Sequence, residues 1–111
     1  MSTKPGLRVL DAARMVVDDI NHMLKSRLPN AKQVREAAES ITANIQEGFG
    51  REAGPDRNQF LRFARASAEE TSERLRARFV AEDIPEKVYW PLHHRLVAIV
   101  RMLTNLMADK K

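Results

Sequence analysis

Two lines of polar residues in this chain have the types and the spacing that chemistry could use. Each line repeats at three- and four-residue intervals and so follows one side of a helix: Ser40, Asn44 and Glu47 in one segment, and Ser67, Glu70 and Arg74 in a later one. A pair of carboxylates can act as general acid and base, but no activated nucleophile accompanies Glu47 and Glu70. We therefore expect a structural hydroxyl–amide–carboxylate network. It would set the register of two helices if the lines face each other, or meet another subunit if they face outward.

Candidate metal ligands lack the spacing that a metal site requires. A di-iron bundle takes carboxylate-x-x-His motifs from different helices, and Asp19-x-x-His22 is the one such motif here. His93 and His94 are adjacent, so on a helix their side chains point about 100° apart. No cysteine is present to supply a thiolate. We expect no metal and no cofactor.

The glycines near position 50 do not form a phosphate-binding loop. Gly48 and Gly50 flank Phe49 at the end of an expected helix, whereas phosphate loops precede a helix that follows a strand. These glycines indicate turn geometry or a close approach between helices.

Four arginines surround the junction between two expected helices: Arg51, Arg57, Arg62 and Arg65. With a net charge of +4 and a pI near 9.9, they favour phosphate contacts and make RNA or DNA the first partner to test. Arg65 has Glu69 one turn later, so a solvated, salt-bridged surface is the competing interpretation. We expect no aromatic platform for base stacking among these arginines.

The helices that must position these residues follow from the apolar pattern. Amphipathic segments cover about 7–28, 31–51, 55–82 and 86–107, separated at Pro29, Gly54-Pro55 and Pro85. The pattern predicts one all-α domain over residues 1–111, an antiparallel up-down-up-down four-helix bundle. Pro91 lacks a backbone N–H and predicts a kink in the last helix, with a loose first turn as the alternative.

Apolar residues outside the expected core indicate association. Trp90 falls opposite the stripe of the last helix, which suggests a partner surface unless a distortion at Pro91 turns the ring back onto its own bundle. Val9, Val16 and Met23 repeat every seven residues beside a second heptad line, giving more apolar surface than one core needs. We expect a homo-oligomer. A protein-interaction or scaffold module without nucleic-acid binding is the alternative function.

Composition places the chain among ordinary globular proteins, with 43% hydrophobic and 31% charged residues. No apolar run approaches the roughly 20 residues of a membrane span, and the polar N-terminus lacks a signal-peptide pattern. We expect a cytoplasmic protein without membrane contact.

Two motifs resemble a known family. Residues 37–51, AAESITANIQEGFGR, are similar to the pattern AA-x-SI-x-x-NI-x-EG-x-GR, and residues 60–70, FLRFARASAEE, are similar to FL-x-x-A-x-GS-x-x-E. Both patterns belong to the S23-like four-helix bundle proteins, known from intervening sequences of large-subunit ribosomal RNA genes. The chain departs from the family at Ala66, usually Gly, and at Thr71, usually Leu.

The resemblance implies a left-handed antiparallel bundle, a ring-like homopentamer and no enzymatic activity. It also implies a fold-level relation to the accessory variability proteins of diversity-generating retroelements, pentamers that bind nucleic acid and a reverse transcriptase. Such a relation raises the expectation of nucleic-acid binding without naming a site.

Overall fold

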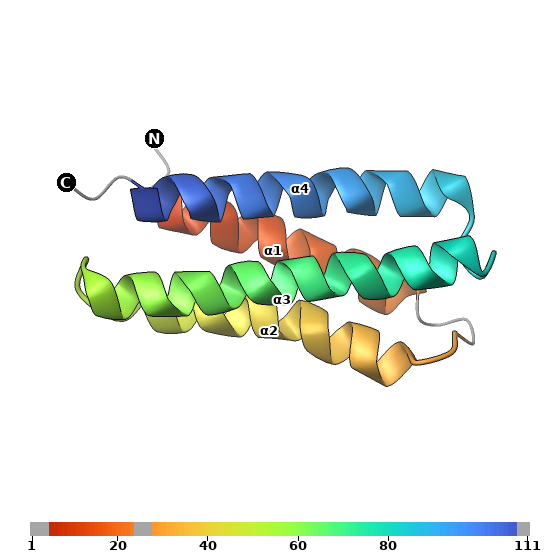
Figure 1. The fold of residues 1–111 in the computed structure, drawn as a ribbon, viewed down its shortest axis with the longest axis horizontal. Coiled ribbons are helices and arrows are strands. Elements are labelled where there is room, and N and C mark those ends of the chain that lie inside the picture. Colours follow the sequence, from red (N-terminus) through yellow and green to blue (C-terminus); the bar gives the residue numbers. More distant parts are fainter. Residues whose placement is uncertain (1–4, 24–27, 109–111) are drawn as a thin grey trace.

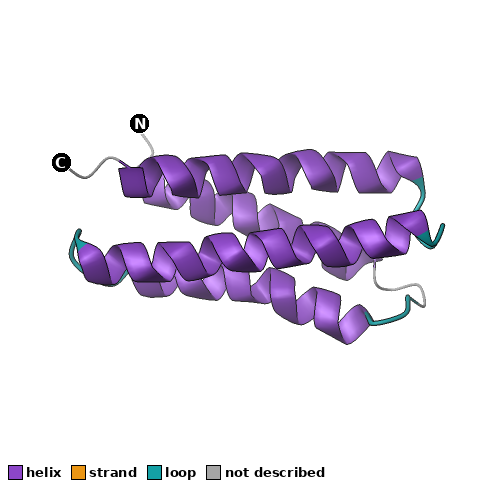
Figure 2. Ribbon diagram, in the orientation of Figure 1, coloured by secondary structure: helices purple, strands orange, loops and turns teal. Residues whose placement is uncertain are grey.

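The structure is a computed structural model that describes residues 5–23 and 28–108. Four helices account for most of these residues: α1 (Pro5–Met23), α2 (Ala31–Phe49), α3 (Pro55–Val80) and α4 (Glu86–Ala108). Successive helices run in opposite directions, and the described residues form no strand (Figures 1 and 2). Each helix packs against two others, α1 and α3 each lying between α2 and α4. The expected antiparallel up-down-up-down bundle is confirmed.

The helices begin where proline and glycine signals place them. Gly54 has a φ of 145°, a backbone conformation that residues with a Cβ rarely adopt, and Pro55 follows at the first position of α3. Pro29 precedes Asn30, which adopts the left-handed conformation (φ 62°) before α2 begins. The positions of these turns therefore follow from the backbone preferences of glycine, proline and asparagine.

The ends of α2 and α3 come two residues earlier than expected. The Arg51 amide donates to the Gly48 carbonyl, a tight turn that closes α2 after Phe49. At the end of α3, Glu82 has a positive φ of 66° and the Asp83 amide donates back to the Arg78 carbonyl. A residue in this left-handed conformation lets the amides that follow the helix donate hydrogen bonds to its last carbonyls, and the helix ends there. For the first helix, residues 24–27 of the expected range lie outside the described residues.

Pro91 does not interrupt α4. It is the sixth residue of the helix and exposed, and the ribbon continues through it without a break (Figure 1). Proline removes only the hydrogen bond that the Lys87 carbonyl would have accepted. Because Lys87 is also exposed, water can replace that bond.

The core consists of one apolar stripe from each helix. Its members have at most 5% of their surface exposed: Val9, Ala13, Val16 and Ile20 on α1; Val34, Ala38, Ile41 and Ile45 on α2; Leu61, Ala64, Ala68 and Leu75 on α3; Tyr89, Leu92, Leu96, Ile99 and Leu103 on α4. The buried Thr71 donates its hydroxyl proton to the Ser67 carbonyl at 2.7 Å, so a polar residue at this family leucine position is satisfied. In the described ranges, no helix is both long and apolar enough to cross a membrane.

The placement of α1 corrects one expectation about the subunit interface. Val9 and Val16 are completely buried in the core of their own chain, so neither can face another subunit. Together with Ala13 and Ile20 they form the centre line of the helix, and Leu10 and Val17 of the second heptad line are partly buried beside it. Met23 is partly buried and packs against the same core.

Gly48 is a point of close approach between α2 and α3. A Cβ built there would lie 3.2 Å from the Cβ of Phe60 and 3.3 Å from the backbone oxygen of Arg57. A Cβ at this position would force the neighbouring atoms of α3 to shift by a few tenths of an ångström, so the contact favours glycine.

We expect Gly48→Val to lower the free energy of unfolding by about 2–3 kcal/mol, because the added methyl groups overpack a tight contact. Gly50→Val is the matched control. Gly50 is exposed, has an ordinary negative φ, and a Cβ there would meet only carbonyl oxygens of its own helix at 3.5 Å. Urea denaturation of both variants measures the difference; equal losses would show that the contact at Gly48 is not limiting.

Candidate nucleic-acid interface

The two polar lines meet at the seam between α2 and α3, but only in part. The Ser67 hydroxyl donates to Ser40 Oγ at 2.9 Å, which joins the two helices. Asn44 Nδ2 donates to the Ser40 carbonyl at 2.9 Å and to Ser40 Oγ at 3.1 Å. These three partly buried residues form one hydrogen-bonded group that links the register of α2 to that of α3.

The charged members of the two lines do not join that group. Glu47 pairs with Arg51 at 3.0 Å, and Glu70 pairs with Arg74 at 2.9 Å, each within its own helix. Both pairs are largely exposed, where an ion pair contributes about 0–1 kcal/mol. Each carboxylate is exposed and paired with an arginine on its own helix. Neither one lies in the buried, apolar environment that a general acid needs.

Arg51 and Arg57, two of the four candidate phosphate ligands, stabilise the turn between α2 and α3. Arg57 Nε donates to the Gly48 carbonyl at 3.3 Å and to the Arg51 carbonyl at 3.1 Å, and its guanidinium lies 4.6 Å from the centre of the Phe49 ring. Arg51 lies 4.2 Å above the Phe60 ring in addition to its pairing with Glu47. Both cations are therefore engaged within the chain.

The other two, Arg62 and Arg65, lie one turn apart on the exposed side of α3 nearest α4. Arg65 Nη1 donates to the hydroxyl of Thr104 at 3.2 Å, which places α3 and α4 side by side at this level. Arg101 lies one turn before Thr104 on α4 and is exposed. We refer to Arg62, Arg65 and Arg101 as the basic face.

No carboxylate partners the basic face within the described residues. Arg65 bonds to a neutral hydroxyl, and neither Arg62 nor Arg101 makes an ion pair there. Glu69, one turn after Arg65, is exposed and does not pair with it. The interpretation as a salt-bridged surface, which was the alternative to phosphate binding, therefore holds for Arg51 and not for Arg62 and Arg65.

Sequence reasoning missed Arg101. The residue lies 36 positions after Arg65, and only the register of α3 against α4 brings it to the same surface. A usable signal was its place on the outward side of the α4 stripe, eleven residues after Trp90.

Trp90 combines the two positions that the sequence left open. Its side chain is 43% exposed, yet its ring packs edge-on against Tyr89 at 5.0 Å and Phe79 at 5.8 Å between centroids. The ring therefore rests on its own bundle while it presents much of its surface to solvent.

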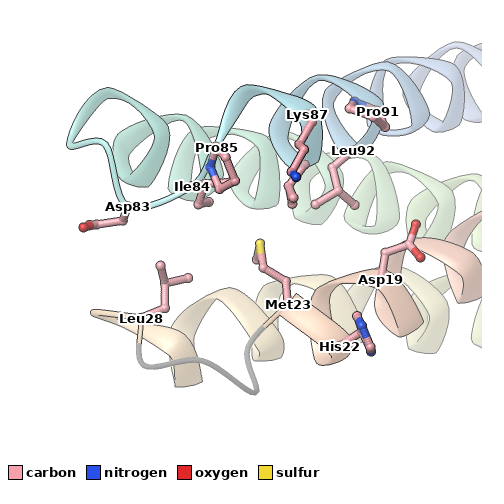
Figure 3. A pocket seen from close by; sticks show the side chains of 11 residues that line it. Asp19, His22, Met23, Leu28, Asp83, Ile84, Pro85, Lys87, Pro91 and Leu92 are labelled. Carbon is pink, nitrogen blue, oxygen red and sulfur yellow. The ribbon is translucent and has the colours of Figure 1, made fainter.

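A hollow near charged groups lies at the end of the bundle, lined by residues of α1 and of the start of α4 (Figure 3). It has a volume of about 410 Å³ and a largely apolar lining that includes Met23, Leu28, Ile84 and Leu92. The carboxylates of Asp19 and Asp83 point away from each other at its edge. Polar groups that diverge in this way do not converge on a ligand as they do in a binding site.

Within residues 5–23 and 28–108, no three His, Asp or Glu side chains gather closely enough to hold a metal ion. In particular, Arg95 lies beside Asp19 with 3.6 Å between Nε and Oδ2, so that carboxylate already has a cation.

The comparisons with known proteins agree with the motifs on α2 and α3. The model of the 23S rRNA-intervening sequence protein family matches residues 6–105. The chain belongs to this family. A crystal structure of a protein of unknown function from the S23 ribosomal protein family of Bacteroides thetaiotaomicron has a TM-score of 0.85 and 21% identity to this family member. The alignment covers 96% of this chain and all of that one, and at this identity it shows a shared fold. No curated protein matches the chain.

We expect Arg57→Ala to lower the free energy of unfolding by about 1.5–3 kcal/mol, because the variant loses hydrogen bonds from a cation to two carbonyls and the stacking on Phe49. Arg62→Ala removes the same charge from an exposed site on the same helix and should change stability by less than about 0.5 kcal/mol. Thermal and urea unfolding of both variants test this; a large loss in Arg62→Ala would assign a structural role to the basic face.

Proposed function

We propose that this member of the 23S rRNA-intervening sequence protein family is a non-enzymatic homo-oligomer that binds RNA or DNA through the outer side of α3 and α4. The observation that supports this most directly is the basic face. Arg62, Arg65 and Arg101 hold three positive charges, and none of them forms an ion pair within the described residues, although Glu69 is exposed one turn after Arg65.

The spacing of the basic face suits a polyanion. Arg62 and Arg65 are three residues apart on a helix, about 4.5 Å along its axis, and Arg101 extends the row beyond Arg65 on the neighbouring helix. Cations in a row on two rigid helices can contact successive phosphates and release the counterions condensed on the nucleic acid. Arginine suits this role because its planar guanidinium binds phosphate through two hydrogen bonds at once.

The absence of enzymatic activity is supported by the state of the candidate catalytic groups. Glu47 and Glu70 are each paired with an arginine on their own helix, and the serine hydroxyls bond to one another and to an amide. A nucleophile needs an adjacent base, and neither serine contacts a carboxylate or imidazole in the described chain.

Assembly is supported by apolar surface that the bundle leaves exposed. On α1, Leu7 is 52% and Met15 49% exposed, and on α3 Phe63 is 46% exposed beside Phe60. Subunit contacts are the usual fate of such surface in a soluble protein. An oligomer would repeat the basic face once in each subunit, so that a long nucleic acid could bind several copies at once and gain avidity.

We expect labelled RNA to bind the purified chain in 50 mM salt and to bind more weakly in 200 mM salt. For three phosphate contacts per site, log Kd should rise with log salt with a slope of about 2 to 3. The double variant Arg62→Ala, Arg65→Ala should weaken binding about tenfold or more and reduce that slope. Fluorescence anisotropy measures both quantities.

The matched control is Arg14→Ala with Lys32→Ala, which removes two exposed positive charges from α1 and α2. It should retain most of the affinity. An equal loss in the control would mean that net charge alone governs binding, and no binding in 50 mM salt would exclude the proposed function.

The oligomer has its own measurement. Light scattering of the dilute protein should give a mass several times 12.7 kDa, and five times that value if the chain assembles as its resemblance to the S23-like family implies. A particle of 12.7 kDa at micromolar concentration would contradict the proposed assembly.

A further inference from the structure

Five aromatic and imidazole rings form a continuous cluster where the end of α3 packs against the start of α4. Its members are Phe79, Tyr89, Trp90, His93 and His94. Tyr89 is buried and stacks on Phe79 with 4.1 Å between parallel rings. This stacked pair forms the base of the cluster, and Trp90 lies on it with 43% of its side chain exposed.

The exposed part of the cluster continues along α4 toward the basic face. Trp90, His94, Val97 and Arg101 recur at i, i+4, i+7 and i+11, and so lie along the outer side of one helix. The distance from Trp90 to Thr104, which Arg65 contacts, is 14 residues or about 21 Å along the axis. On α3, the exposed Arg76 lies one turn before Phe79 and adds a cation at the level of the cluster.

We propose that Trp90 is a base-stacking platform, and that Trp90 and the basic face together form one track for single-stranded nucleic acid. This inference rests on the proposed function and specifies the class of nucleic acid. A base in a single strand can leave its neighbours and stack on an aromatic ring, whereas a duplex keeps the faces of its bases covered. Trp90 would hold a base while the arginines hold phosphates.

The environment of Trp90 favours this role because its ring is held in place. Edge-on contacts with Tyr89, Phe79 and His93 (5.0, 5.8 and 5.4 Å between centroids) limit its rotation. A ring that is already ordered loses little conformational entropy when a base stacks on it. His94, at 6.2 Å and tilted by 32°, extends the flat surface along the direction of the basic face.

The side chains between Trp90 and the basic face favour a nucleic acid over an apolar partner. Between Trp90 and Arg101, the only other large apolar side chain on this side of α4 is Val97, and the polar His94 separates it from Trp90. Arg76 and Lys87 are exposed within one turn of the cluster. Two exposed carboxylates lie nearby as well, Glu73 one turn before Arg76 and Glu86 one turn before Trp90, so the positive charge of the track comes from Arg62, Arg65 and Arg101. A track of about 21 Å corresponds to the short end of the site sizes of about 4–16 nucleotides that single-strand-binding domains use.

The experiment uses the full chain with an unlabelled 12-nucleotide single strand and with the unlabelled duplex of the same sequence. Trp90 is the only tryptophan in the chain, so its intrinsic fluorescence reports on this site alone. The single strand should quench that fluorescence, and the duplex should quench it much less. Absence of quenching by a single strand that binds would overturn the stacking role.

Substitutions separate the ring from the charge. Trp90→Ala should weaken single-strand binding about 5- to 150-fold, the range for loss of one stacked base, and change duplex binding less than about twofold. Trp90→Phe keeps an aromatic ring on the cluster and should recover much of the affinity. Val80→Ala truncates an exposed apolar residue at the end of α3 that is outside the row from Trp90 to Arg101, and this matched control should bind like the original chain.

The remaining outcomes distinguish the two proposals. If Arg62→Ala with Arg65→Ala weakens binding and Trp90→Ala does not, the proposed function stands and the stacking platform is wrong. If neither nucleic acid binds, the proposed function fails. If Trp90→Ala leaves binding intact but lowers the mass measured by light scattering, Trp90 belongs to a subunit contact instead, and the inference fails.

Discussion

The packing of α2 directly against α3 is the constraint on which the rest of the molecule depends. At Gly48 the two backbones approach so closely that no Cβ fits without displacing Phe60 or the main chain of Arg57. One register satisfies both this contact and the hydrogen bond between the Ser40 and Ser67 hydroxyls, which lies two turns further along the seam. Hydroxyl groups that bond across a helix pair lose that bond if either helix slides by a turn, so the polar pair selects the register that the apolar stripes alone leave degenerate.

That register divides the arginines into two groups that differ in the side chains and carbonyls they contact. Near the turn, carbonyls at the end of α2 and the rings of Phe49 and Phe60 attract guanidinium groups, and Arg51 and Arg57 are engaged there. One to three turns further along α3, the helix faces α4, which offers the hydroxyl of Thr104 to Arg65 and no carboxylate among the described residues. Arg62, Arg65 and Arg101 therefore lie on the outer side of α3 and α4 without an ion pair among the described residues. The proposed function follows from this separation.

Family membership and fold similarity limit the interpretation without supplying a mechanism. The match over residues 6–105 and the TM-score of 0.85 establish the family and the bundle, and the solved relative is itself of unknown function. At 21% identity that relative shows the architecture alone. The proposals accordingly depend on the side chains of this chain: the uncompensated arginines, the exposed Trp90 and the apolar residues left on α1 and α3.

The sequence by itself determined the helices and their order, because the period of the apolar residues and the prolines and glycines at the breaks act over a few residues. It could not determine which side of a broad apolar surface faces the centre, and for that reason Val9 and Val16 were assigned to an interface although both are buried. Nor could it distinguish Arg57 from Arg62, since the same residue type caps a helix or faces solvent according to what the next helix places beside it. Only tertiary structure decided these points, because the register between helices depends on contacts such as Gly48 with Phe60 and Arg65 with Thr104, between residues 12 and 39 positions apart that local periodicity does not encode.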